Sequence, residues 1–105
     1  MIPKIYTPDD IVAILENGLV DYRRLSGNMY WFGIGQDYQI GSIALSQNEL
    51  RCRFHYNDGD KTYTNTFIYD QDAFMREIDK AKQAYRHKKQ VELQLELDVL
   101  ETLTK

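Results

Sequence analysis

The stretch LRCRFHYNDGDKTYTNTF, residues 50–67, carries the clearest structural signal in this chain. Apolar and polar side chains alternate on both sides of Asp58-Gly59, a dipeptide preferred in the two-residue turns of β-hairpins. The alternation gives one mainly apolar face, made of Leu50, Cys52, Phe54, Tyr63 and Phe67. The other face carries Arg51, Arg53, His55, Thr62, Thr64 and Thr66. The pattern predicts an antiparallel hairpin with one face on a core.

A turn at residues 58–59 also predicts the register of this hairpin. The expected pairs are Phe54 with Tyr63, Cys52 with Asn65, and Leu50 with Phe67. A slip of one residue would turn the apolar side chains of one strand toward solvent, because side chains alternate between the two faces.

The residues before this hairpin predict a helix followed by further strands. The helix start is marked by a hydroxyl N-cap, a proline and two carboxylates: Thr7, Pro8, Asp9 and Asp10. The helix should run to about Asn17, and Gly18 can adopt the left-handed conformation that ends many helices. From Leu19 onward, short apolar or aromatic runs alternate with turn residues, which is typical of a strand meander.

Three consecutive aromatic residues lie within this meander. A strand must point Trp31 to one face and Tyr30 with Phe32 to the other. One of these faces should lie on the core. The other is either covered by the N-terminal helix or exposed as an interaction patch, since aromatic residues dominate the energetics of many interfaces.

The residues after the hairpin predict a long helix. Asp70 or Asp72 can cap it, and one apolar stripe has helical spacing: Phe74, Ile78, Ala81 and Tyr85. The segment VELQLELDV, residues 91–99, alternates as a strand would, although most of its residues are helix formers. No glycine or proline follows Gly59, so the sequence favours one helix over residues 71–103, about 50 Å long. A strand over residues 91–99 remains the alternative.

These elements predict an α+β fold in a single domain, residues 1–105. We expect an N-terminal helix, a meander sheet of four or five antiparallel strands, and a long C-terminal helix. The hydrophobic fraction of 43% and the charged fraction of 28% are close to globular averages. The lone Cys52 excludes an intramolecular disulfide, and the N-terminus has no basic region followed by an apolar run. We therefore expect a cytoplasmic protein that does not interact with membranes.

The C-terminal part is expected to be an association segment, residues 91–105. Residues 71–90 hold six basic and three acidic side chains, a balance of +3, whereas residues 91–105 hold one basic and four acidic, a balance of -3. Two antiparallel copies could pair basic with acidic segments. The predicted dimerisation residues are Val91, Leu93, Leu95, Leu97, Val99 and Leu100.

Catalytic chemistry has little support in the sequence. The soft or borderline metal ligands are His55, His87 and Cys52, and none has the paired spacing of a zinc site. Cys52 is expected on the core face, away from the neighbouring arginines, so its thiol should not be activated. We expect no catalytic residues, no metal and no cofactor.

The functional hypothesis is a non-catalytic protein-interaction module, a homodimer that occupies the surface of an unidentified protein partner. Small accessory, immunity or inhibitor-type proteins act in this way. The candidate partner-binding residues are Tyr30, Trp31, Arg51, Arg53 and His55. The alternative is a nucleic-acid or small-anion binding protein that uses the Arg51, Arg53 and His55 face together with the basic helix segment.

Overall fold

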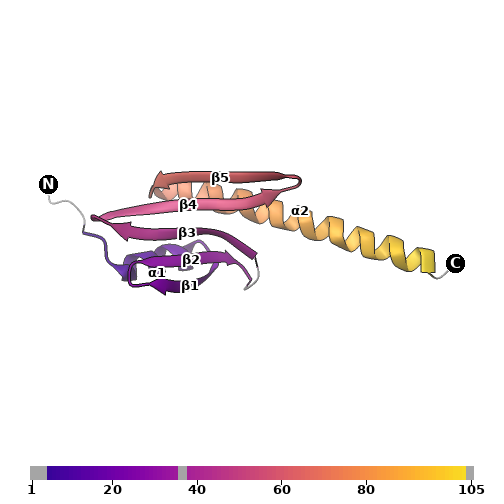
Figure 1. Ribbon diagram of the computed structural model, residues 1–105, viewed down its shortest axis with the longest axis horizontal. Helices are drawn as coiled ribbons and strands as arrows, with labels where there is room; N and C mark the ends of the chain where they lie inside the picture. Colours follow the sequence, from indigo (N-terminus) through magenta and orange to yellow (C-terminus); the bar gives the residue numbers. More distant parts are fainter. Residues whose placement is uncertain (1–4, 36–37, 104–105) are drawn as a thin grey trace.

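The computed structural model, which describes residues 5–35 and 38–103, confirms the α+β fold (Figure 1). Helix α1 (Pro8–Asn17) precedes the sheet, and helix α2 (Gln71–Leu103) follows it. The strands are β1 (Asp21–Ser26), β2 (Met29–Ile34), β3 (Tyr38–Ser46), β4 (Glu49–Asp58) and β5 (Lys61–Ile68). They form one antiparallel sheet in the order β1-β2-β3-β4-β5, as expected for a meander. Both helices cover the same side of this sheet, so its other side is open.

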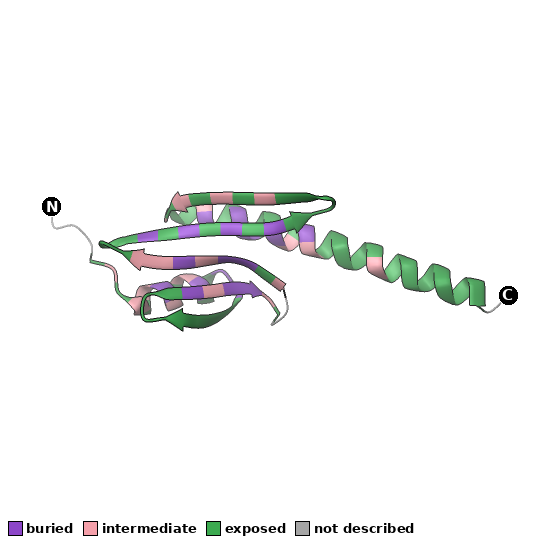
Figure 2. Ribbon diagram, viewed as in Figure 1, coloured by how far each residue is buried: buried purple, intermediate pink, exposed green. Residues whose placement is uncertain are grey.

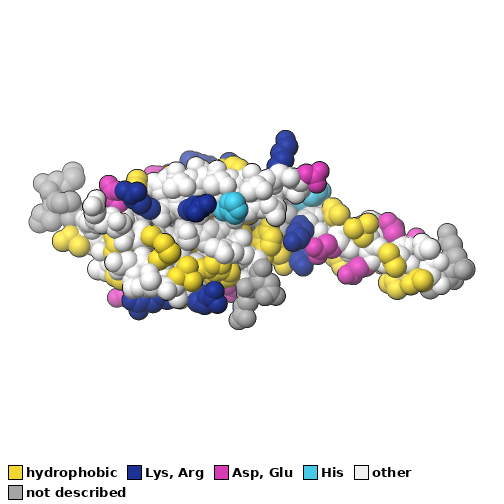
Figure 3. All heavy atoms as spheres, in the orientation of Figure 1, with side chains coloured by type: hydrophobic (Ala, Val, Ile, Leu, Met, Phe, Trp, Pro, Cys, Tyr) yellow, Lys and Arg dark blue, Asp and Glu magenta, His cyan; other side chains and the backbone are white. Residues whose placement is uncertain are grey.

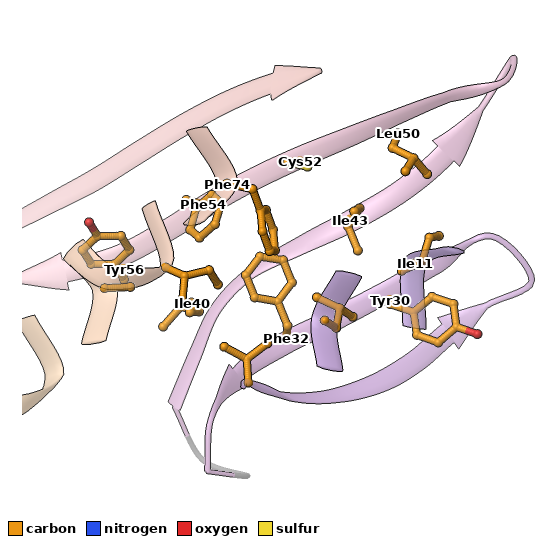
Figure 4. Close-up of a cluster of buried hydrophobic side chains, with 14 of the residues drawn as sticks. Ile11, Tyr30, Phe32, Ile40, Ile43, Leu50, Cys52, Phe54, Tyr56 and Phe74 are labelled. Atoms are coloured by element: carbon orange, nitrogen blue, oxygen red, sulfur yellow. The ribbon is translucent and has the colours of Figure 1, made fainter. Parts of the chain in front are cut away.

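The core lies between the sheet and the two helices (Figure 4). At its centre the ring of Phe74 in α2 lies 5.7 Å from that of Phe32 and 5.5 Å from that of Phe54. Gly41 makes room for this aromatic group, because a Cβ there would lie 2.3 Å from the Arg53 carbonyl oxygen and 2.7 Å from the Phe32 ring. Burial of these large rings supplies much of the hydrophobic stabilisation.

Helix α1 begins as the sequence predicts but ends differently. The Thr7 amide donates to the Asp10 carboxylate at 2.8 Å, which satisfies one of the unpaired donors at the helix start. Gly18 was the expected left-handed residue, and this expectation is wrong: Gly18 has φ -75°, whereas Leu19 has φ 55°. The Gly18 amide still donates to the Ile14 carbonyl at 3.0 Å, so the helical geometry extends through Gly18 and the chain reverses one residue later.

The faces of the β4–β5 hairpin are as predicted, but the register is not. Asp58 pairs with Lys61, so the turn residues are Gly59 and Asp60, and Gly59 alone takes a positive φ, of 64°. The observed pairs are Phe54 with Asn65, Cys52 with Phe67, and Tyr56 with Tyr63. This shift of two residues leaves every side chain on its predicted face, because the side-chain period is two. It also brings the rings of Tyr56 and Tyr63 to 5.1 Å, a contact that the predicted register lacks.

Helix α2 is continuous through the segment 91–99, so the favoured helix prediction is confirmed and the strand alternative is not. Of the two candidate caps, Asp70 accepts the Ala73 amide at 2.9 Å. The helix leaves the sheet after Tyr85, whose ring lies 5.0 Å from that of Tyr38. Beyond it, residues 86–103 are all exposed except the half-buried Glu92 (Figure 2). This projecting part gives the molecule its length of 70 Å against a width of 21 Å.

Candidate functional site

The first candidate surface is the uncovered side of the sheet, here called the open face. Its central row crosses the sheet through residues paired from strand to strand: Arg23, Trp31, Ser42, Arg53 and Thr66. A neighbouring row contains Met29, Ala44, Arg51 and Ile68. His55 and Thr64 form a further pair. Figure 3 shows that basic, histidine and hydrophobic side chains gather on this face.

The contacts on the open face combine positive charge with an aromatic ring. The guanidinium carbon of Arg23 lies 5.7 Å from the centre of the Trp31 ring, within the range of a cation–π interaction. Arg51 forms an exposed ion pair with Glu49 at 3.5 Å. Arg53 takes part in none of the ion pairs between described residues.

A hollow of about 250 Å³ lies beside Arg53 on this face. It is lined by Gln39, Gly41, Ser42, Arg53 and His55. The Nδ1 atom of His55 lies 2.9 Å from the Thr64 hydroxyl, which holds the imidazole beside the hollow. Guanidinium, hydroxyl and amide groups are suited to binding a carboxylate or phosphate oxygen.

The structure brings four of the five predicted partner-binding residues together, namely Trp31, Arg51, Arg53 and His55. Tyr30 does not join them, since it points to the helix-covered side and is 7% exposed. Sequence reasoning missed Arg23, because the alignment of β1 on β2 depends on a bulge between Arg24 and Ser26 that no sequence pattern marks.

The second candidate surface is the projecting part of α2, residues 86–103, here called the tail. Its large apolar side chains are between 47% and 76% exposed. They form two stripes: a sheet-side stripe of Val91, Leu95, Val99 and Leu103, and an outer stripe of Leu93, Leu97 and Leu100. Polar contacts along the tail are local, such as Lys89 with Glu92 at 3.3 Å and Gln94 with Asp98 at 3.1 Å. Figure 3 shows hydrophobic side chains (yellow) and acidic side chains (magenta) side by side along the tail.

A second hollow, of about 530 Å³, lies where the tail begins, and we call it the foot hollow. It is lined by Tyr56, Asp58, Tyr63, Lys80, Gln83, Ala84 and His87. Burial raises the pKa of Tyr56 to about 12, and the negative charge of Glu77 adds to this effect. No sequence pattern marked Glu77 as buried, yet it is 6% exposed and contacts Lys80 at 3.4 Å.

The described residues contain no cluster of metal-binding side chains, and the thiol of Cys52 is buried. No three histidine, cysteine, aspartate or glutamate side chains within 5–35 and 38–103 are arranged to hold a metal ion. Cys52 is buried, and this burial raises the pKa of its thiol to about 12. A thiol with that pKa stays protonated at neutral pH and is a poor nucleophile.

No helix within the described residues is long and apolar enough to cross a membrane. Comparison of the chain with protein-family models, with curated proteins and with solved structures found no match.

Proposed function

We propose that this protein is a non-catalytic interaction module that forms a homodimer through its tail and uses its open face to bind a partner protein. The observation that carries this proposal is the apolar character of the tail. Seven valine and leucine side chains are about half or more exposed on the part of α2 that projects beyond the sheet.

A projecting helix of this kind is expected to need a partner. Most helix stability in proteins comes from packing an apolar face against a neighbour, and the apolar side chains of the tail pack on no other element of the described chain. Exposed apolar surface of this extent marks interaction sites in many proteins. A second copy is a suitable partner because it carries the same stripes, with a basic segment before them and acidic residues among them.

Light scattering after size exclusion tests the self-association. We expect the full chain to have the mass of a dimer and a variant ending at Gln90 to be a folded monomer. Leu95→Glu in the full chain should also give a monomer, because it places a charge within the apolar stripe, whereas Gln94→Glu on the polar side is the matched control. A full chain that is monomeric at about 100 µM would exclude any self-association useful in a cell.

The open face supports the partner-binding part of the proposal. Tryptophan and arginine are enriched among residues that dominate binding energies, and Trp31 lies in one row with Arg23 and Arg53. The module would act as a small accessory, immunity or inhibitor-type protein by occupying its partner's surface. We place it in the cytoplasm, where a lone reduced cysteine is ordinary.

A second candidate function is the binding of nucleic acid or of a small anion on the same face. It is favoured by the hollow beside Arg53, where basic and hydroxyl groups converge. Single-stranded oligonucleotides and inorganic phosphate can be titrated at low and high salt. Binding that weakens steeply with salt and is lost in Arg53→Ala, but kept in Lys61→Ala at the exposed hairpin end, would support it. The absence of binding at low salt would exclude it.

A further inference from the structure

The sheet-side stripe of the tail is in line with the part of α2 that packs on the sheet. Successive residues in an α-helix are turned by about 100°, so Val91, Leu95 and Val99 fall within an arc of about 80°. The same arc contains Ala81 and Ala84, which are 0% and 8% exposed because the sheet covers them. The sheet-side stripe therefore faces the same direction as the residues that pack on the sheet. The space beside it lies directly beyond the end of the sheet.

We infer that this space is filled by the tail of a second copy, which runs antiparallel to the first. This inference rests on the proposed self-association and specifies its surface, its direction and its register. Each sheet-side stripe would cover the other, and the two sheets would lie at opposite ends of the helix pair.

The shape of the molecule favours the antiparallel direction. Packed helices lie about 8–10 Å apart, so a parallel partner on the sheet-side stripe would place its residues 71–85 where the sheet of the first copy already lies. An antiparallel partner brings only its C-terminal end toward that sheet. Figure 1 shows that the tail extends well beyond the strands, so this end has room to approach.

The distribution of charge favours the same direction. The start of the tail is basic, with Arg86, Lys88 and Lys89, whereas the acidic residues Glu92, Glu96, Asp98 and Glu101 follow it. Antiparallel pairing about Leu95 places Lys89 of each tail level with Glu101 of the other, while Glu92 lies level with Asp98. Parallel pairing would place like charges at the same level, which is unfavourable.

The spacing of the sheet-side stripe sets the register. Val91 and Val99 lie four residues on either side of Leu95, so two antiparallel stripes cover each other fully when Leu95 lies opposite Leu95 and Val91 opposite Val99. Gln83 and His87 precede Val91 at intervals of four residues and line the foot hollow, so the row followed by the partner leads to this recess.

Cysteine cross-linking tests this arrangement, since Cys52 is buried and the native chain serves as a control. A disulfide requires Cβ atoms about 3.5–4.5 Å apart. On mild oxidation, Leu95→Cys should form a covalent dimer with itself, in at least about fivefold greater yield than Leu97→Cys on the outer stripe. Val91→Cys and Val99→Cys should cross-link when mixed and remain largely uncrosslinked alone. All four positions are 47% to 59% exposed, so these variants should fold.

The results of cross-linking and light scattering distinguish failure of the antiparallel arrangement from failure of the proposed self-association. Cross-linking of Val91→Cys with itself, at the rate of Leu95→Cys, would show parallel pairing and overturn the inference. Preferential cross-linking of Leu97→Cys would place the contact on the outer stripe, with the same consequence. In both cases light scattering would still show a dimer. A native chain that remains monomeric would instead overturn the proposed self-association.

Discussion

The two halves of α2 have similar apolar spacing but very different surroundings. In residues 71–85 the stripe that contains Phe74, Ile78 and Ala81 is buried against the sheet. Residues 86–103 contain seven leucines and valines, yet all of them are exposed. The comparison teaches that apolar periodicity marks the side of a helix suited to burial, whereas the length of the neighbouring sheet decides where burial within the chain ends.

The largest expected effect comes from truncating the packed half. Phe74→Ala should destabilise the protein by about 3–5 kcal/mol, because Phe74 is 1% exposed and contacts three aromatic rings. Leu97→Ala in the tail should change the unfolding free energy by less than about 0.5 kcal/mol when measured on dilute, monomeric protein. Urea unfolding followed by tryptophan fluorescence measures both. Equal losses would contradict the distinction between the two halves.

Alkaline pH should lower the stability of the folded domain. The thiol of Cys52 has a pKa of about 12 in the folded protein and its ordinary pKa of 9.0 in the unfolded chain, so above pH 9 the unfolded chain binds fewer protons than the folded one. The contribution of the buried, protonated thiol to the free energy of unfolding is therefore fully present below pH 9. Between pH 9 and 12 the free energy of unfolding should fall by up to about 1.4 kcal/mol per pH unit. Urea unfolding at about pH 8 and about pH 10.5, on either side of the ordinary thiol pKa, tests this. Cys52→Ala should be less sensitive to pH over this range, and an identical slope would exclude the thiol as the cause.

A glycine placed in each half sharpens the comparison. Arg76→Gly on the exposed side of the packed half should cost about 1 kcal/mol of global stability. Gln94→Gly should instead leave the urea midpoint of the dilute protein unchanged and reduce its helical circular dichroism, because the tail can unfold locally. A lower urea midpoint for Gln94→Gly would show that the tail unfolds together with the rest of the domain.

The smallest effect is expected from one ion pair in the tail. Glu92→Gln removes the partner of Lys89 and should reduce local helix stability by about 0.3 kcal/mol. The difference from the native chain should disappear in high salt, since exposed charges are screened. Helical circular dichroism of the monomer at low and high salt measures it. A difference that persists in high salt would show that Glu92 stabilises the tail by something other than its charge.

The sequence predicted the elements well because their signals are local. The capping residues at Thr7 and Asp10, the alternation in residues 50–67 and the missing helix breakers after Gly59 all act over short distances. The hairpin register was missed, because a shift of two residues preserves the faces and depends on the Tyr56 contact with Tyr63. The left-handed residue was also missed, because the helix geometry continues through Gly18.

Some features of the two candidate surfaces were predictable from local sequence, and others depended on the tertiary structure. From the sequence alone, Arg53 is expected to point away from the apolar face of the hairpin, and Trp31 and Tyr30 are expected on opposite faces of their strand. The C-terminal segment also has more leucine and valine than one neighbour can cover. Tertiary structure decided that both helices lie on one side of the sheet, which removed Tyr30 from the open face and added Arg23 to it. It also decided that the sheet ends near Tyr85. The physical reason is that side-chain direction follows from local backbone period, whereas exposure depends on which distant element reaches the same place.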